Sequence, residues 1–290
     1  MFPVFPFFSA KFRNHLCLNL ADELKSMSND RRFLKLRTGR IEFEIYGTLA
    51  PDTLALVFLH DGLGCCSLWR DFPQRVANES GLPAVVYSRP GYGASDPVEP
   101  RSSVRYMHDE ALDVLPSVLK ELHVGRHALV GHSDGASIAI IYAGHAQPSN
   151  LEGLALIAPH VFVEPVTLRS IAQAREAFEK GELAAKLRVW HGTNTEYAFF
   201  RWNDSWLHPD FRHWNIEEYI PKIRVPILVI QGDQDEYATL AQVDAIQRGA
   251  RVPVRSLVLD GCGHFPQREK PDTVVKAIAD FVVSLKPITS

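Results

Sequence analysis

Six short runs of almost wholly apolar residues constrain the fold of this chain more than any other feature of its sequence. Each is rich in Val, Ile or Leu and ends in Gly, Pro, Asp, Ser or His; they cover 54–60, 83–90, 127–133, 153–159, 226–233 and 254–261. Runs of this length and composition are typical of strands buried on both faces, as in a parallel sheet. Two further strands are predicted before them, in RRFLKLRTG and RIEFEIYG, which form an antiparallel hairpin that turns at Thr38-Gly39.

Helical patterns separate most of these runs, and they are predicted at 104–122, 136–144, 238–249 and 271–285. The first contains Pro116, which should kink it, because proline cannot donate the backbone hydrogen bond of a helix. This alternation of strands and helices predicts an α/β fold, in which helices cover both faces of a mostly parallel sheet with right-handed connections.

The interval 160–222 carries no strand pattern. It is helix-like at 168–187 and then rich in aromatic residues, and a loop of this length without structure would be unusual. We therefore predict a helical cap over 160–222, inserted into an α/β core formed by 31–159 and 223–290.

Residues 1–30 are predicted to be an N-terminal extension with little regular structure. Pro3 and Pro6 interrupt its apolar start, no positively charged segment precedes it, and no small-x-small cleavage site follows. Such an extension, or a start codon assigned too early with Met27 as the true start, is favoured over a targeting signal.

Composition narrows the class of protein. The 290 residues are 46% hydrophobic and 22% charged, as in ordinary globular proteins, and the net charge of −3 provides no field that would attract nucleic acid. No apolar run approaches the roughly 20 residues that cross a bilayer. The four cysteines lack metal-ligand or disulfide spacing and suit reduced thiols in a cytoplasmic protein. We expect a small-molecule substrate, no metal or cofactor, no membrane or nucleic-acid partner, and either a monomer or a homodimer.

The sequence Gly131-His132-Ser133-Asp134-Gly135 matches the pattern G-x-S-x-G. It closes a predicted strand and opens a predicted helix, which is where a nucleophile elbow lies. The tight turn needs glycines and lifts the serine Oγ clear of the sheet, beside a helix N-terminus that favours developing negative charge. We therefore predict that Ser133 is a catalytic nucleophile.

A serine hydroxyl needs a base that is held by a third group, and in this architecture the chain order is Ser, acid, His. His264 follows the last predicted strand on a Gly-rich loop, which selects it over His132, a neighbour of the nucleophile that should point away. The loop after the second-to-last predicted strand contains three carboxylates. Asp235 is the predicted acid, Asp233 is the alternative, and Glu236 should face solvent.

The oxyanion formed during acyl transfer needs two N–H donors. One is predicted to be the backbone N–H of Asp134, directly after the nucleophile, and the other to come from the loop after the first buried strand. In that loop we assign Gly62, with Leu63 as the alternative, while His60 should bond the loop backbone.

These motifs resemble those of the α/β-hydrolase superfamily. Leu59-His60-Asp61-Gly62 is similar to its HG loop, with Asp61 where Gly is usual, and 88–95 is similar to its D-x-R-G-x-G-x-S loop, with Ser88 and Pro90 as departures. The resemblance spans about Phe33 to Leu285 and implies an α/β-hydrolase fold, with a mostly parallel eight-stranded sheet and a helical cap after the sixth strand.

Within the superfamily, the Ser-Asp-Gly elbow and the loop Gly62-Leu63-Gly64-Cys65 resemble the valacyclovir hydrolase-like group. That resemblance implies that Asp134 pairs with a substrate amine; the alternative is a carboxylate that only stabilises the helix N-terminus. Trp202 and Trp206 are candidate substrate contacts, unless the cap aromatics simply form the core of the cap.

Three functions remain open from the sequence. The first is a serine esterase that cleaves a small carboxylic ester, or a thioester or amide, through an acyl-enzyme on Ser133. The second is a carbon–carbon bond hydrolase of a ring-cleavage product, which uses the same triad. The third is a non-catalytic ligand receptor on the same fold, which is disfavoured because no triad residue is lost.

Overall fold

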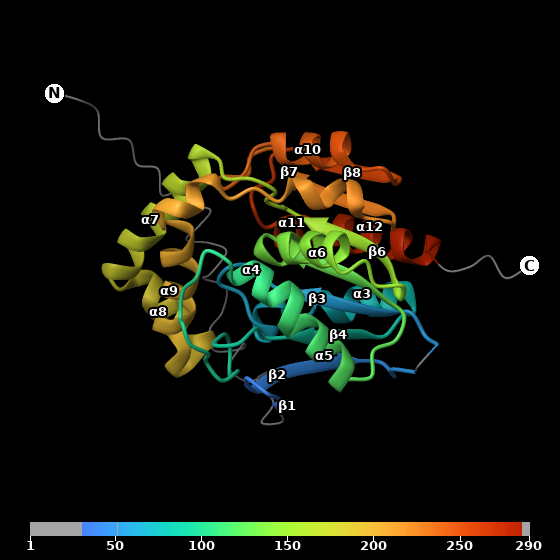
Figure 1. Ribbon diagram of the computed structural model, residues 1–290, viewed down its shortest axis with the longest axis horizontal. Coiled ribbons are helices and arrows are strands. Elements are labelled where there is room, and N and C mark those ends of the chain that lie inside the picture. The colour runs from blue at the N-terminus through green and yellow to red at the C-terminus, as the bar shows by residue number, and fades with distance from the viewer. Residues whose placement is uncertain (1–30, 51, 286–290) are drawn as a thin grey trace, which may run out of the picture. The chain divides into compact units, whose positions relative to one another are not determined.

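The computed structural model describes residues 31–50 and 52–285, so the prediction for residues 1–30 lies outside the described part of the chain. Its centre is an eight-stranded sheet with the strand order β1-β2-β4-β3-β5-β6-β7-β8 (Figure 1). The strands are β1 (Arg32–Leu36), β2 (Gly39–Tyr46), β3 (Ala55–Leu59), β4 (Ala84–Tyr87), β5 (His127–His132), β6 (Leu151–Ile157), β7 (Ile227–Gly232) and β8 (Val254–Leu259).

The sheet is mostly parallel, as predicted. Only β2 runs antiparallel to its neighbours, β1 and β4, and the remaining pairs are parallel. From β3 the chain moves to β4 on one side and then returns to β5 on the other side of β3. Ligands of open α/β sheets bind at the carboxyl ends of the strands where the order reverses in this way, so the loops after β3 and β5 mark the expected site.

One face of the sheet packs against α3 (Phe72–Ser80) and α12 (Pro271–Ser284). Side chains of both helices share a buried cluster with alternate residues of the central strands, such as Phe58 and Val130, because successive side chains of a strand point to opposite faces. In Figure 1, α4 (Tyr106–Asp109), α5 (Leu115–Glu121) and α6 (Asp134–His145) lie in front of the strands. Helix α3 is a feature that the sequence analysis did not predict.

A π-helical turn precedes Pro116, the residue at which a kink is predicted. Residues Glu110–Val114 are π-helical, and α5 follows directly. Pro116 cannot bond the carbonyl of Leu112, four residues earlier, and a wider turn accommodates that loss.

The helices of 160–222 stand apart from those that cover the sheet. They are α7 (Pro165–Glu179), α8 (Glu182–His191) and α9 (Thr195–Trp206), followed by short 3₁₀ turns, and they group together at the left of Figure 1. The single helix predicted at 168–187 is two helices, because Gly181 adopts φ +90°, a left-handed conformation that ends α7. We refer to 160–222 as the helical insertion.

None of the helices within residues 31–50 and 52–285 combines the length and the apolarity that crossing a bilayer requires.

Candidate active site

The turn that follows β5 places Ser133 in a strained backbone conformation. Its φ and ψ are 54° and −117°, and α6 begins at the next residue. The turn is crowded: a Cβ at Gly135 would lie 2.0 Å from the carbonyl oxygen of Leu59, so glycine is required there. Strain of this kind costs free energy and is characteristic of functional sites.

Three side chains from separate loops meet beside this turn. The Oγ of Ser133 donates a hydrogen bond to Nε2 of His264 over 3.0 Å. The Nδ1–H of His264 in turn donates to Oδ2 of Asp235 over 2.8 Å. All three side chains are buried, so water does not compete for these bonds. The structure therefore brings together the hydroxyl, imidazole and carboxylate that the chain order singled out.

The carboxylate of Asp235 is held by further donors. Its Oδ2 accepts from Nε2 of Gln231 over 2.6 Å, and its Oδ1 accepts the backbone N–H groups of Tyr237 at 2.8 Å and Ala238 at 3.1 Å. Burial alone would raise the pKa of Asp235, but His264 and the N–H donors outweigh it and lower the pKa. The carboxylate is therefore ionised at neutral pH.

The same pairing acts on His264 in the opposite sense. Burial alone would lower the pKa of its imidazole, whereas the charge and hydrogen bond of Asp235 raise it, and the net pKa lies above the usual value. A base of this kind accepts a proton readily and stabilises the imidazolium that results.

The other two carboxylates of the acid loop have structural contacts. Asp233, the alternative acid, accepts the backbone N–H of Gly261 over 2.7 Å and is not hydrogen-bonded to the imidazole. Glu236 is exposed, and its Oε2 also accepts the backbone N–H of His264 over 3.2 Å. Both therefore hold the histidine loop against the acid loop.

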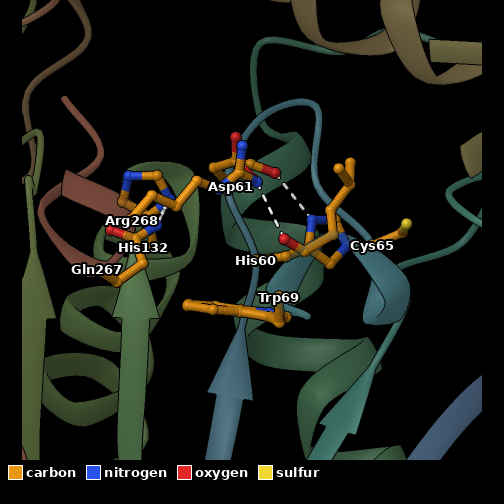
Figure 2. Close-up of a pocket in the computed structure, with 8 residues that line it drawn as sticks. His60, Asp61, Cys65, Trp69, His132, Gln267 and Arg268 are labelled. Carbon is orange, nitrogen blue, oxygen red and sulfur yellow. Dashed lines mark hydrogen bonds between the residues drawn. The ribbon is translucent and has the colours of Figure 1, made fainter. Parts of the chain in front are cut away.

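His132 contacts the histidine loop rather than the nucleophile. Its Nε2–H donates to the backbone carbonyl of His264 over 2.8 Å, and its Nδ1 accepts from Nε2 of Gln267 over 3.1 Å. Burial lowers the pKa of His132 to about 4, so the neutral ring keeps both bonds at neutral pH. Figure 2 shows His132 and Gln267 together on one side of a small cavity, with His60 and Asp61 on the other.

Replacing His132 with Phe keeps an aromatic ring but removes the bond to the carbonyl of His264. We expect kcat to fall about 10- to 100-fold with little change in KM, because a small misplacement of the base is costly. Gln267→Leu removes only the hydrogen bond from Gln267 to Nδ1 of His132, so its effect on kcat should be smaller. Steady-state kinetics on variants with unchanged thermal unfolding would test this, and equal activity of His132→Phe and the wild type would contradict it.

The loop after β3 carries the other predicted oxyanion donor. The carbonyl of Asp61 accepts a hydrogen bond from Nδ1–H of His60 over 2.8 Å, so His60 bonds the loop backbone as predicted. A Cβ at Gly62 would lie 2.3 Å from the indole of Trp202, which packs directly on this loop from α9. Trp202 therefore contacts the predicted oxyanion loop itself.

The side chain of Asp134 is completely buried and has protein partners. Its Oδ2 accepts from the hydroxyl of Tyr106 over 2.6 Å, and its Oδ1 accepts from Nε1–H of Trp206 over 3.2 Å. In this arrangement no carboxylate oxygen is exposed to a substrate amine, in contrast to the role that the resemblance implies. Its place at the first turn of α6 fits the alternative, a carboxylate at a helix N-terminus, and Trp206 is occupied in holding it.

Aromatic rings surround the imidazole of His264. The ring of Tyr237 lies 4.7 Å from it between centroids, Phe265 5.5 Å and His160 5.7 Å. Burial lowers the pKa of His160 to about 3, so this ring is also neutral. The sequence analysis did not predict that these three rings or Gln231 would lie at the site. The one signal in the sequence is that they are close, along the chain, to Asp235, to His264 or to the end of a strand.

Within residues 31–50 and 52–285, no cluster of His, Cys, Asp and Glu side chains has the geometry to hold a metal ion. Cys65 and Cys66 are buried free thiols, and Cys262 is also buried.

A mostly parallel sheet with a serine elbow after β5, an acid loop after β7 and a histidine loop after β8 has the architecture of an α/β hydrolase. A model of the alpha/beta hydrolase family matches residues 56–277, and the chain belongs to that family of hydrolases.

Similar proteins have several hydrolytic activities. Over 289 residues the chain is 24% identical to 2-hydroxy-6-oxononadienedioate/2-hydroxy-6-oxononatrienedioate hydrolase 2 of Pseudomonas putida, which corresponds to 89% of this chain and 98% of the relative. A structure from work on carboxylesterases of Nitrososphaera gargenis matches with a TM-score of 0.72 and 17% identity, over 88% of this chain and 98% of the other. The enol-lactonase of Burkholderia xenovorans matches with a TM-score of 0.66 and 21% identity, over 87% and 99%. Structural likeness at these identities indicates a shared fold.

Proposed function

We propose that this protein is a serine hydrolase that cleaves a small carboxylic ester through an acyl-enzyme on Ser133. The observation that supports this most is the continuous hydrogen-bonded chain from Ser133 Oγ through the imidazole of His264 to the carboxylate of Asp235. Such a chain removes the proton that makes a serine hydroxyl a weak nucleophile. The same acyl-transfer chemistry would also cleave thioesters or amides.

The reaction proceeds in two halves. Ser133 Oγ attacks the carbonyl carbon while its proton passes to Nε2 of His264, and the carbonyl electron pair moves to the oxygen. The N–H groups of Gly62 and Asp134 stabilise this oxyanion, and collapse of the intermediate expels the alcohol, which takes the proton from His264. A water molecule then attacks the acyl-enzyme, with His264 as base, and the acid leaves as Ser133 regains its proton.

The surroundings of the triad favour an uncharged acyl group. The rings that border His264 are uncharged, and the guanidinium of Arg89, beside Asp134, is only 1% exposed. Apolar surroundings with a few fixed polar groups are typical of sites for small neutral ligands.

Carbon–carbon bond hydrolysis is the second candidate, favoured by the similarity to the Pseudomonas putida relative over most of both chains. The dioate in the name of that relative carries two carboxylates. Binding such a molecule calls for a cationic partner. Arg89 is already engaged with the backbone carbonyl of Asp61 and the carboxylate of Asp134. Arg268, which lines the small cavity, donates to the carbonyl of Leu68. The ester hydrolase is therefore the better-supported function.

A covalent probe and two substrate classes test the proposal together. We expect a fluorophosphonate to label the protein once, at Ser133, and p-nitrophenyl esters of short acids to be hydrolysed with an initial burst that reports the acyl-enzyme. Turnover of a 2-hydroxy-6-oxo-dienoate but of no ester would favour the carbon–carbon bond hydrolase. Absence of both labelling and turnover would favour a non-catalytic receptor. A cytoplasmic location and a monomeric or homodimeric state stay predictions.

A further inference from the structure

Arg89 is a buried charged residue directly beyond β4, and it has no role in the triad. Its side chain is 1% exposed, and its guanidinium lies over the ring of Tyr92 at 4.7 Å from the centroid. Because a buried guanidinium is costly unless it is paired, its partners indicate why it is retained.

The first partner is the oxyanion loop. Nη2–H of Arg89 donates to the backbone carbonyl of Asp61 over 2.7 Å. That carbonyl belongs to the same planar peptide unit as the N–H of Gly62, and in a trans peptide the two groups point in opposite directions. Holding the carbonyl therefore fixes the direction of the N–H, and a charge-assisted bond to the carbonyl also polarises the peptide as a donor.

His60 completes this arrangement. The backbone N–H of Arg89 donates to Nε2 of His60 over 3.0 Å, so the proton of the neutral ring lies on Nδ1. That Nδ1–H donates to the same carbonyl of Asp61 over 2.8 Å. Burial and the nearby Arg89 charge hold the pKa of His60 well below its usual value, which keeps the ring neutral. Two donors, one of them charged, thus fix this peptide.

The second partner lies on the other side of the predicted oxyanion hole. Nη1 of Arg89 is 3.7 Å from Oδ2 of Asp134, the residue whose backbone N–H follows the nucleophile. Nη1 has no hydrogen-bond partner among residues 31–50 and 52–285, so its interaction there is one of charge with charge. A single guanidinium thus contacts the carbonyl of the peptide unit that carries the Gly62 N–H and the side chain of Asp134, the other assigned donor residue.

We propose that Arg89 is the positioning residue of the oxyanion hole, in which one buried cation holds the Gly62 donor through the carbonyl of Asp61 and the Asp134 donor through its carboxylate. This inference rests on the proposed acyl transfer at Ser133. Arg89 does not contact the reacting atoms; it sets the separation and direction of the groups that do.

A second buried arginine serves as the control that separates a role in the oxyanion hole from a role in stability alone. Arg201, in α9, is also buried and pairs with the buried carboxylate of Glu110 over 3.0 Å. It has the same charge as Arg89 but contacts neither the Asp61 carbonyl nor Asp134. Removing either guanidinium takes the cationic partner away from a buried carboxylate, so both losses should destabilise the fold, whereas only the loss of Arg89 should affect the oxyanion hole.

The experiment compares Arg89→Met, Arg201→Met and the double variant Arg89→Met/Asp134→Asn, with p-nitrophenyl butyrate as substrate. For Arg89→Met we expect kcat to fall about 100-fold while KM stays within about threefold. An aryl trifluoromethyl ketone, which forms a tetrahedral adduct with the serine, should lose affinity by the same factor. The acid limb of the pH profile should not move, because the His264–Asp235 pair is untouched.

Arg201→Met should lower Tm by a similar amount to Arg89→Met yet retain kcat within about threefold. The double variant removes the unpaired charge, so its Tm should recover while kcat stays low; if Arg89→Met does not fold, the double variant is the protein to measure. Normal kcat in Arg89→Met, an equal loss in Arg201→Met, or recovery of kcat in the double variant would each overturn the inference.

The two proposals can fail separately. A wild-type protein that is not acylated at Ser133 overturns the proposed function and this inference with it. A wild-type protein that is acylated, together with an Arg89→Met variant that reacts equally fast, overturns the role of Arg89 alone.

Discussion

A Ser133→Ala variant is expected to lose about six orders of magnitude in kcat, the size of loss found when a serine protease loses its nucleophile. In the proposed mechanism the Oγ is the atom that forms the acyl-enzyme, and His264 has no other hydroxyl within hydrogen-bond reach among the described residues. The fold should persist, because the hydroxyl makes a single side-chain hydrogen bond, to the histidine, and the rest of the elbow is unchanged. Ester turnover and circular dichroism of the purified variant would measure the two quantities.

Ser137 provides the matched control for this experiment. It lies one turn further along α6 and is also buried, but its Oγ donates to the carbonyl of His160 over 2.6 Å instead of to the imidazole. Fluorophosphonate labelling should disappear in Ser133→Ala and persist in Ser137→Ala. Labelling that survives in Ser133→Ala would place the nucleophile elsewhere and end the proposed mechanism.

An Asp235→Asn variant is expected to keep its fold but lose about 10⁴-fold in kcat, because an amide cannot hold the imidazole in the tautomer that accepts the serine proton. A matched change at Asp233, whose carboxylate accepts the N–H of Gly261, should leave kcat within about threefold. Normal activity of Asp235→Asn together with loss in Asp233→Asn would move the acid to Asp233.

The pH profile gives an independent measure of the same pairing. The proposed mechanism requires neutral His264, so the rate should fall as pH decreases through the raised pKa of that imidazole. In Asp235→Asn the largest influence that raises the pKa is gone, and only the smaller effects of Glu236 and Asp61 still oppose burial, which lowers the pKa, so the acid limb should move to lower pH. An acid limb at the same pH in Asp235→Asn and in the wild type would show that Asp235 does not control the protonation of His264.

The elements that could be predicted from the sequence are those whose signals are local. The elbow at Ser133 was recognisable because the tight turn demands glycines within two residues of the nucleophile. The buried strands were recognisable because their apolar runs are continuous. His264 and Asp235 followed from chain order and strand ends.

Other features left no such signal. Helix α3 was missed because its apolar residues Phe72, Val76 and Ala77 make only a short pattern. The division of 168–187 depends on the left-handed conformation of Gly181, since glycine within a helical pattern is tolerated at many positions. The burial of Asp134 depends on Tyr106 and Trp206, which are distant in the sequence.

From the sequence alone came the strands, most of the helices, the tight serine turn, and the prediction of the base and acid loops, because each depends on residues within a few positions of one another. Only the tertiary structure decided which buried charges pair. It turned Asp134 inward, joined His132 to the carbonyl of His264, and placed Arg89 between Asp61 and Asp134. The physical reason is that the partner of a buried polar group is set by packing between distant segments, and no local pattern of residues encodes that choice.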